Sequence, residues 1–108
     1  MPTLSDRLHP KRFPGMSGRM AALVGYILGK RWSKTRIAEL VITSDGWLLA
    51  RNRRHIGFDT IIGTVADLDR NWSNLLRAAN LTREERQEAG ERYREAVRSC
   101  RKRQSERN

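Results

Sequence analysis

The chain has 108 residues and a formal net charge of +10, because 22 lysines and arginines oppose 12 aspartates and glutamates. A chain of this length buries one hydrophobic core, and no second domain is expected. The single cysteine, Cys100, excludes an intramolecular disulfide and is typical of a reducing compartment, so a cytoplasmic location is expected. The longest apolar run, Met20 to Leu28, is far shorter than the roughly 20 residues of a transmembrane helix, so no integral membrane segment is expected.

The first third of the chain divides into an arm and a helix. Residues 1–16 contain all three prolines and are predicted to form an extended, basic arm. Ser17 is a suitable N-cap for a helix that follows it. An alternative takes residues 20–28 as a strand of a three-stranded meander, but the helix is favoured because its apolar residues recur at helical spacing. These residues are Met20, Leu23, Val24, Ile27 and Leu28.

Residues 36–54 predict a β-hairpin, around which the rest of the chain is organised. Two β-rich runs flank Asp45-Gly46, a pair typical of a two-residue type I′ turn. Such a turn places Ile42 opposite Leu49 and residue 40 opposite residue 51, with each opposed pair on one face. Both faces are apolar near the turn, so the hairpin is expected to be covered on both sides.

The second half predicts a short third strand and two helices. Residues 58–62 contain enough β-branched side chains to form the strand, which is expected to end at Gly63. Thr64 is a clear N-cap for the first helix, Asn80 is suited to its left-handed end, and Thr82 with Glu85 forms a capping box for the second. The apolar stripe of the first helix contains Val65, Leu68, Trp72, Leu75, Leu76 and Ala79, and that of the second contains Ala89, Tyr93, Ala96, Val97 and Cys100.

Together these elements predict a small α+β domain over residues 17–100, with an N-terminal helix, a β-hairpin with a short third strand, and two C-terminal helices. The hairpin is expected to lie between the first helix and the last two. Residues 1–16 are the arm, and residues 101–108 are expected to form a flexible basic tail. A winged-helix arrangement fails on length, because no room is left for a separate recognition helix before the first strand.

The sequence offers no catalytic or cofactor-binding constellation. Two histidines 46 positions apart and one cysteine do not supply a metal site, and no glycine-rich phosphate loop is present. Acidic residues such as Asp45 and Asp67 have ordinary roles in turns and at helix starts, which argues against a metal-dependent nuclease. The protein is therefore expected to be non-catalytic and to bind no cofactor or metal.

The charge distribution predicts a nucleic-acid-binding protein, of DNA or RNA. Residues 1–36 carry eight basic groups and one acidic group, and residues 98–108 carry five and one, so the excess lies at the two ends. Arginine, the commoner basic residue, suits forked contacts with phosphate, and Trp32 among basic residues suits stacking on a base. The residues predicted to bind nucleic acid are Lys11, Arg12, Arg19, Lys30, Arg31, Trp32, Lys34, Arg36, Arg51, Arg53, Arg54, His55, Arg101, Lys102 and Arg103.

The alternative is a protein-interaction module, an adaptor or inhibitor that binds an acidic partner through a sheet edge or a helix face. A sheet of two or three strands leaves unpaired edges, which can take up a partner strand or a second copy of the chain. The narrow apolar stripe of the last helix also suits a neighbouring helix.

Overall fold

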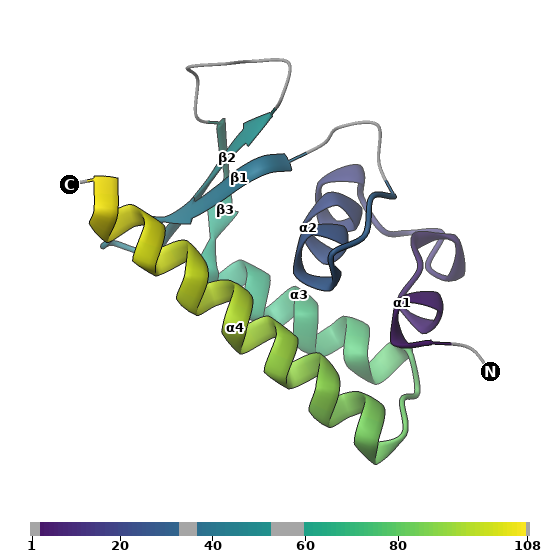
Figure 1. Ribbon diagram of the computed structural model, residues 1–108. Helices are drawn as coiled ribbons and strands as arrows, with labels where there is room; N and C mark the ends of the chain where they lie inside the picture. Colours follow the sequence, from purple (N-terminus) through teal and green to yellow (C-terminus); the bar gives the residue numbers. More distant parts are fainter. Residues whose placement is uncertain (1–2, 33–36, 53–59, 108) are drawn as a thin grey trace.

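The computed structural model describes residues 3–32, 37–52 and 60–107, with the side chains of residues 38, 52, 60 and 102–107 excepted. Figure 1 shows the order of the elements along the chain. They are α1 (Leu4–Arg7), the 3₁₀ helix η1 (Pro10–Arg12), α2 (Gly18–Leu28), β1 (Ile37–Ile42), β2 (Trp47–Asn52), β3 (Thr60–Thr64), α3 (Val65–Ala78) and α4 (Arg83–Arg107). The predicted α+β class, with an N-terminal helix, a hairpin with a third strand and two C-terminal helices, is confirmed.

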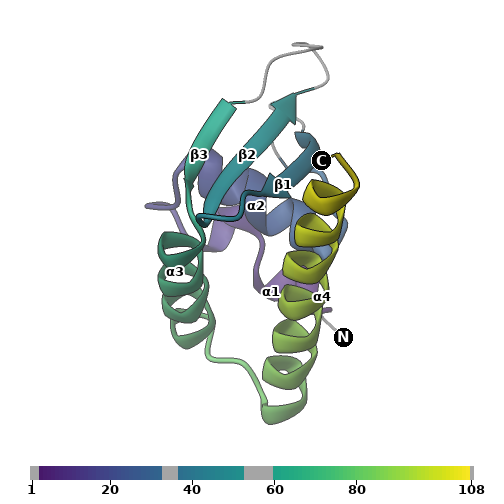
Figure 2. The same ribbon diagram turned by 90° about the vertical axis from the view of Figure 1, so that its left-hand side faces the viewer.

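The three strands form one antiparallel sheet in the order β1-β2-β3. Figure 2 shows α2 crossing behind this sheet, α3 extending from the end of β3, and α4 running along the side of β1. The inner face of the sheet carries Leu40, Ile42, Leu48 and Ala50, all of which are buried in a core that they share with residues of α2, α3 and α4. On the outer face, Val41 of β1 is also buried, whereas Trp47 of β2 is exposed, so the prediction that both faces are covered holds at β1 and fails at Trp47.

The hairpin turn has three residues, Ser44 to Gly46, instead of two. Thr43 lies opposite Trp47, since the backbone N–H of Thr43 donates to the Trp47 carbonyl at 2.9 Å, and the Gly46 N–H donates to the Thr43 carbonyl at 3.0 Å. Gly46 has φ +89°, whereas Asp45 has no positive φ, so the predicted type I′ turn does not form. A three-residue loop of this kind is a type I turn followed by a left-handed residue.

The longer turn shifts the pairing of the two strands by one residue. Ile42 pairs with Leu48 and Leu40 with Ala50, where the sequence predicted residues 49 and 51 as their partners. Because side chains alternate between faces along a strand, this shift moves Leu48 and Ala50 onto the same face as Leu40 and Ile42. The structure thereby gathers four small and medium apolar side chains on the inner face and leaves Arg51 on the other.

The predicted helix after Ser17 is confirmed, and the alternative strand is wrong. The Ser17 hydroxyl accepts a hydrogen bond from the Met20 N–H at 3.1 Å, as expected of an N-cap. At the other end, Gly29 has φ +69°, the Lys30 N–H donates to the Gly25 carbonyl at 2.7 Å, and the Gly29 N–H donates to the Tyr26 carbonyl at 3.3 Å. This pair of hydrogen bonds is a Schellman motif, which ends α2.

The caps predicted for the last two helices are confirmed as well. The Thr64 hydroxyl accepts from the Asp67 N–H at 3.1 Å, and Asn80 has φ +50° beyond the end of α3. Trp72 is buried in the core, as its place on the apolar stripe predicts. The third strand lies at Thr60–Thr64, later than predicted, and Gly63 is paired with Leu48 within it instead of ending it.

Both ends of the chain contradict the sequence prediction. Residues 3–12 are not an extended arm: they form α1 and η1, and Leu4 and Leu8 are buried in the main core. Residues 101–107 are helical, because α4 continues to Arg107, where the sequence predicted a separate tail. The buried leucines supply the physical reason at the N-terminus, since a segment that buries two large apolar side chains gains enough to become ordered.

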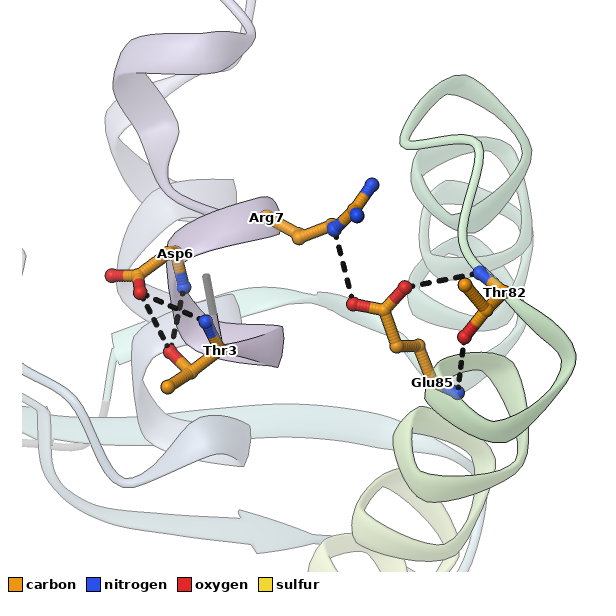
Figure 3. A network of polar contacts seen from close by, with 5 residues as sticks. All are labelled: Thr3, Asp6, Arg7, Thr82 and Glu85. Atoms are coloured by element: carbon orange, nitrogen blue, oxygen red, sulfur yellow. Dashed lines mark hydrogen bonds and ion pairs between the residues drawn. The ribbon is translucent and has the colours of Figure 1, made fainter. Parts of the chain in front are cut away.

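Helix α1 is held to the start of α4 by polar contacts (Figure 3). The Arg7 guanidinium lies 3.1 Å from the Glu85 carboxylate, measured from Nε to Oε2. The same carboxylate accepts a hydrogen bond from the Thr82 N–H at 3.0 Å, and the Thr82 hydroxyl accepts one from the Glu85 N–H at 3.2 Å. The hydrogen bond from the Thr82 backbone, with a smaller effect of the Arg7 charge, holds the pKa of Glu85 below its ordinary value of 4.5.

A second capping box stabilises α1 itself. The Thr3 N–H and hydroxyl both donate to the Asp6 carboxylate at 2.9 Å, and the Asp6 N–H donates back to the hydroxyl at 3.3 Å. These hydrogen bonds, and after them the charges of Lys30 and Arg12, lower the pKa of Asp6. The sequence carries this signal as Thr-Leu-Ser-Asp, which resembles a capping box with Asp at the third helical position.

We predict that Gly25→Ala destabilises the protein by about 1–3 kcal/mol, the usual cost of overpacking. An alanine Cβ at this position would lie 2.5 Å from the Lys30 carbonyl oxygen, so the Schellman turn would have to move. This cost opposes the gain of about 1 kcal/mol that alanine brings to a helix. Urea denaturation measures the change. The matched control is Gly18→Ala, whose Cβ would meet no atom within 4 Å; a stabilised Gly25→Ala variant would contradict the close approach.

We predict a pH-dependent contribution from Glu85. Because its pKa is lower in the folded state, its carboxylate stabilises the fold above the ordinary pKa of 4.5, and this contribution is lost as the pH falls through the folded value. Glu85→Gln should therefore be less stable than the parent chain at neutral pH and lose less stability on acidification. Urea denaturation at a series of pH values tests this, with exposed Glu84→Gln as control. Equal acid sensitivity in the parent chain and Glu85→Gln would contradict it.

Candidate functional site

The outer face of the sheet carries the exposed apolar side chains. Trp47 is 44% exposed and Ile61 is 59% exposed, and these are the large hydrophobic residues left exposed in the described part of the chain. Leu49 pairs with Ile61 across β2 and β3 and shares a face with Trp47 two residues away. We call Trp47, Leu49 and Ile61 the outer apolar patch.

The position of the outer apolar patch follows from the register and from a bulge. Leu48 pairs with Gly63 and Leu49 pairs with Ile61, so Ile62 is the extra residue of β3. Ile62 is half-buried and packs against the core, whereas Ile61 points to the outer face. Figure 2 shows that face turned toward the viewer, with no helix in front of β2 or β3.

A polar pair borders the outer apolar patch. The Arg51 Nη1 lies 3.3 Å from the Glu39 Oε2, and these residues are paired across β1 and β2. Both side chains are about one-third to one-quarter exposed, 32% for Arg51 and 26% for Glu39. Strand β3 is the outer strand on the other side, paired within the described sheet with β2 alone. An apolar centre with a polar border beside an edge strand is the usual anatomy of a protein-binding surface.

The structure scatters the residues predicted to bind nucleic acid. Lys11 and Arg12 are exposed on η1, Arg19 is exposed at the start of α2, and Lys30 and Arg31 are exposed after it. Arg51 lies in β2 and pairs with a carboxylate, and Arg101 is exposed on α4, whose backbone also includes Lys102 and Arg103. Lys34, Arg36, Arg53, Arg54 and His55 lie outside the described residues. Among the described residues, Lys30 and Arg12 converge, since both act on Asp6.

Trp32 is not placed for stacking on a base. Its side chain is half-buried and packs against the core, and its ring centroid lies 5.1 Å from that of His9 at an interplanar angle of 46°. Trp32 therefore helps to fix the first segment of the chain to the domain, and the prediction that it stacks on a base is not supported.

Many arginines are engaged with carboxylates of the chain itself. Arg7, Arg51, Arg70, Arg92 and Arg98 each form an ion pair, and Arg92 also donates to the Leu28 carbonyl at 3.2 Å. The Arg7–Glu85 pair and the hydrogen bond from Arg92 to Leu28 join segments that are distant in the sequence, whereas Arg70, Arg92 and Arg98 pair with carboxylates of their own helices. Part of the arginine content thus serves the fold, which the count of charges does not reveal.

The described ranges contain no group of three or more His, Cys, Asp or Glu residues placed to hold a metal ion. In the same part of the chain, no helix combines the length and apolarity needed to cross a membrane.

Comparison with protein families gives a match for part of the chain. Residues 51–98 match the family model of the P21-Rho-binding domain. The match covers slightly less than half of the chain, from the end of β2 through β3 and α3 to most of α4. Searches of curated proteins and of solved structures each found no match.

This similarity overturns the prediction of a nucleic-acid binder. The matched family is described by its binding to a protein, so DNA or RNA as the main partner is wrong, and the alternative reading as a protein-interaction module is favoured. The physical reason is that a positive field attracts any polyanion or acidic surface and does not identify which. The residues that form the outer apolar patch were missed, because apolar residues on both faces of the hairpin led to the expectation that both faces are covered.

We predict that substitutions at Ile61 and Val41, the two residues paired with Leu49 in the neighbouring strands, differ sharply in their effect on the free energy of unfolding. Ile61→Thr keeps a β-branched side chain at an exposed position and should change the free energy of unfolding by no more than about 0.5 kcal/mol. Val41→Thr places a hydroxyl where the side chain is 2% exposed and should cost about 1–3 kcal/mol. Thermal and urea denaturation measure both. A large loss in Ile61→Thr would mean that this face is covered in solution.

Proposed function

We propose that the chain is a non-catalytic protein-interaction module whose partner is a small GTPase of the Rho type, bound in the cytoplasm. The observation that carries the proposal is the match of residues 51–98 to the P21-Rho-binding domain. The expectation of a reducing compartment from the single cysteine fits this location.

The matched residues support the proposal because they form a continuous part of the fold. Strand β3 leads directly into α3, which turns back through Asn80 into α4, and the start of α3 is capped by Thr64. The unmatched first half of the chain supplies α2, which packs behind the sheet, and β1, which completes it. A partner thus meets a surface whose shape is set by the folded domain, which limits the entropy cost of binding.

The outer apolar patch is the surface we assign to this partner. Ile61 belongs to the matched segment, while Trp47 and Leu49 extend the same surface beyond it. Exposed aromatic and aliphatic residues within a polar border are the residues that contribute most to protein association. The net charge of +10 favours a partner with an acidic surface and speeds its approach.

We predict saturable binding of a purified Rho-type GTPase to the 108-residue chain, measured by isothermal titration calorimetry. The GTPase is loaded in separate experiments with GDP and with a non-hydrolysable GTP analogue, so that dependence on the nucleotide is measured. Ile61→Thr should weaken binding at least about tenfold, which corresponds to 1.4 kcal/mol, because it removes an anchor from the outer apolar patch.

The control is Ala78→Ser, an exposed substitution at the end of α3 that lies far from the sheet in both ribbon views (Figures 1 and 2). It should bind as tightly as the parent chain. Absence of binding in both nucleotide states contradicts the proposed function. If Ile61→Thr binds the GTPase as tightly as the parent chain does, the proposed function stands, but the outer apolar patch is not the surface that binds the GTPase.

A further inference from the structure

A groove of about 240 Å³ lies between the start of α2, the end of β3 and the first turns of α3. Its floor is apolar: Leu23, Leu48 and Leu68 are buried, and Met20 and Ile62 are half-buried. Leu48 belongs to the inner face of the sheet, so the groove opens away from the outer apolar patch. The two surfaces share β3 as a wall and lie on opposite faces of it.

The rim of the groove is basic. Arg19 comes from α2 and Arg70 from α3, and both are exposed. In the described part of the chain Arg19 makes no ion pair, and Arg70 pairs with Asp67 on the same rim. That pair is 69% and 51% exposed, so it is worth little and can be exchanged for a carboxylate of a partner. Two cations thus face one anion here, in a chain whose whole charge is +10.

The wall at Gly63 leaves space that a partner side chain can fill. A Cβ placed on this glycine would meet no atom within 4 Å, and its backbone does not require positive φ. Gly63 is paired with Leu48 and lies beside the apolar floor. A glycine at this place keeps the groove open, and a larger residue can be introduced without backbone strain.

We propose that this groove docks an acidic segment of a partner protein, with one aliphatic side chain on the apolar floor and flanking carboxylates beside Arg19 and Arg70. Charge complementarity selects this occupant. A basic segment would be repelled by the net charge of the chain and by the guanidinium groups of Arg19 and Arg70. An acidic segment is attracted at long range and forms ion pairs with these two arginines at short range. An apolar core with a polar rim is the usual anatomy of a protein-binding surface. This second docking site is additional to the surface assigned to the GTPase.

The test is a nuclear magnetic resonance titration of the ¹⁵N-labelled full chain with the peptide acetyl-Glu-Glu-Leu-Glu-Glu-amide. Saturable shifts are expected at the amides of Gly63, Arg19 and Arg70, without comparable shifts at Ile61. Replacing the four glutamates by glutamine, or the leucine by glycine, should each weaken the interaction, because the first removes the ion pairs and the second removes the anchor.

Four variants, one of them a double substitution, sharpen the test. Arg19→Gln combined with Arg70→Gln should weaken peptide binding about tenfold, Gly63→Val should abolish it by filling the groove, and Asp67→Asn should strengthen it by removing the competing carboxylate. Arg77→Gln, on the same helix but outside the groove, is the matched control and should have a small effect.

Several outcomes would overturn the proposal. They are an equal loss of affinity in Arg77→Gln and in the double variant of Arg19 and Arg70, shifts spread over the whole surface, or equal binding of the glutamine peptide. Inorganic phosphate that reproduces the full set of shifts would show a simple anion site, and the same shifts on concentrating the chain without peptide would show a second copy as the occupant. The peptide titration contains no GTPase, so its failure and failure of the proposed function are separate results.

Discussion

The three-residue turn from Ser44 to Gly46 determines how the rest of the structure is arranged. Thr43 fixes the turn: its hydroxyl accepts from the Trp47 N–H at 3.0 Å and donates to the Asp45 carboxylate at 2.8 Å. Gly46 takes the left-handed conformation that closes the loop, and its carbonyl accepts a hydrogen bond from the Val65 N–H at 2.9 Å. One turn therefore sets the strand register and satisfies a backbone donor at the start of α3, which would otherwise lack a helical partner.

The register in turn separates a buried core face from an outer face that exposes Trp47 and Ile61. With residue 48 opposite residue 42, the inner side chains of both strands are buried together in the core, and Trp47 remains on the outer side. The bulge at Ile62 lets β3 contribute to both environments, because one isoleucine packs toward the core and its neighbour is exposed. The outer apolar patch and the groove are thus two consequences of the same strand pairing.

The sequence predicted the features that depend on local contacts. The N-caps at Ser17, Thr64 and Thr82 each involve residues three positions apart, and all three are confirmed. The register was wrong because a change of one residue in turn length reverses every face, and Asp-Gly fits both turn lengths. The order of residues 3–12 was missed because it depends on Leu4 and Leu8 packing against elements far away in the sequence.

The candidate site was harder to predict, since net charge is a sum that hides how individual charges are used. Arg7 and Arg92 join α4 to α1 and to the end of α2, so they contribute to the positive total while serving the fold. Arg19 and Arg70 contribute the same charge, but they lie at the rim of an apolar groove where a partner can reach them. A charged side chain contributes to specific binding when it lies beside a surface of complementary shape that also makes apolar contacts. Which charged residues lie beside such a surface is known only from the folded structure. In the functions proposed above, the positive field of the whole chain would act on the rate at which an acidic partner arrives, and contacts with the groove and the outer apolar patch would set the rate at which it dissociates.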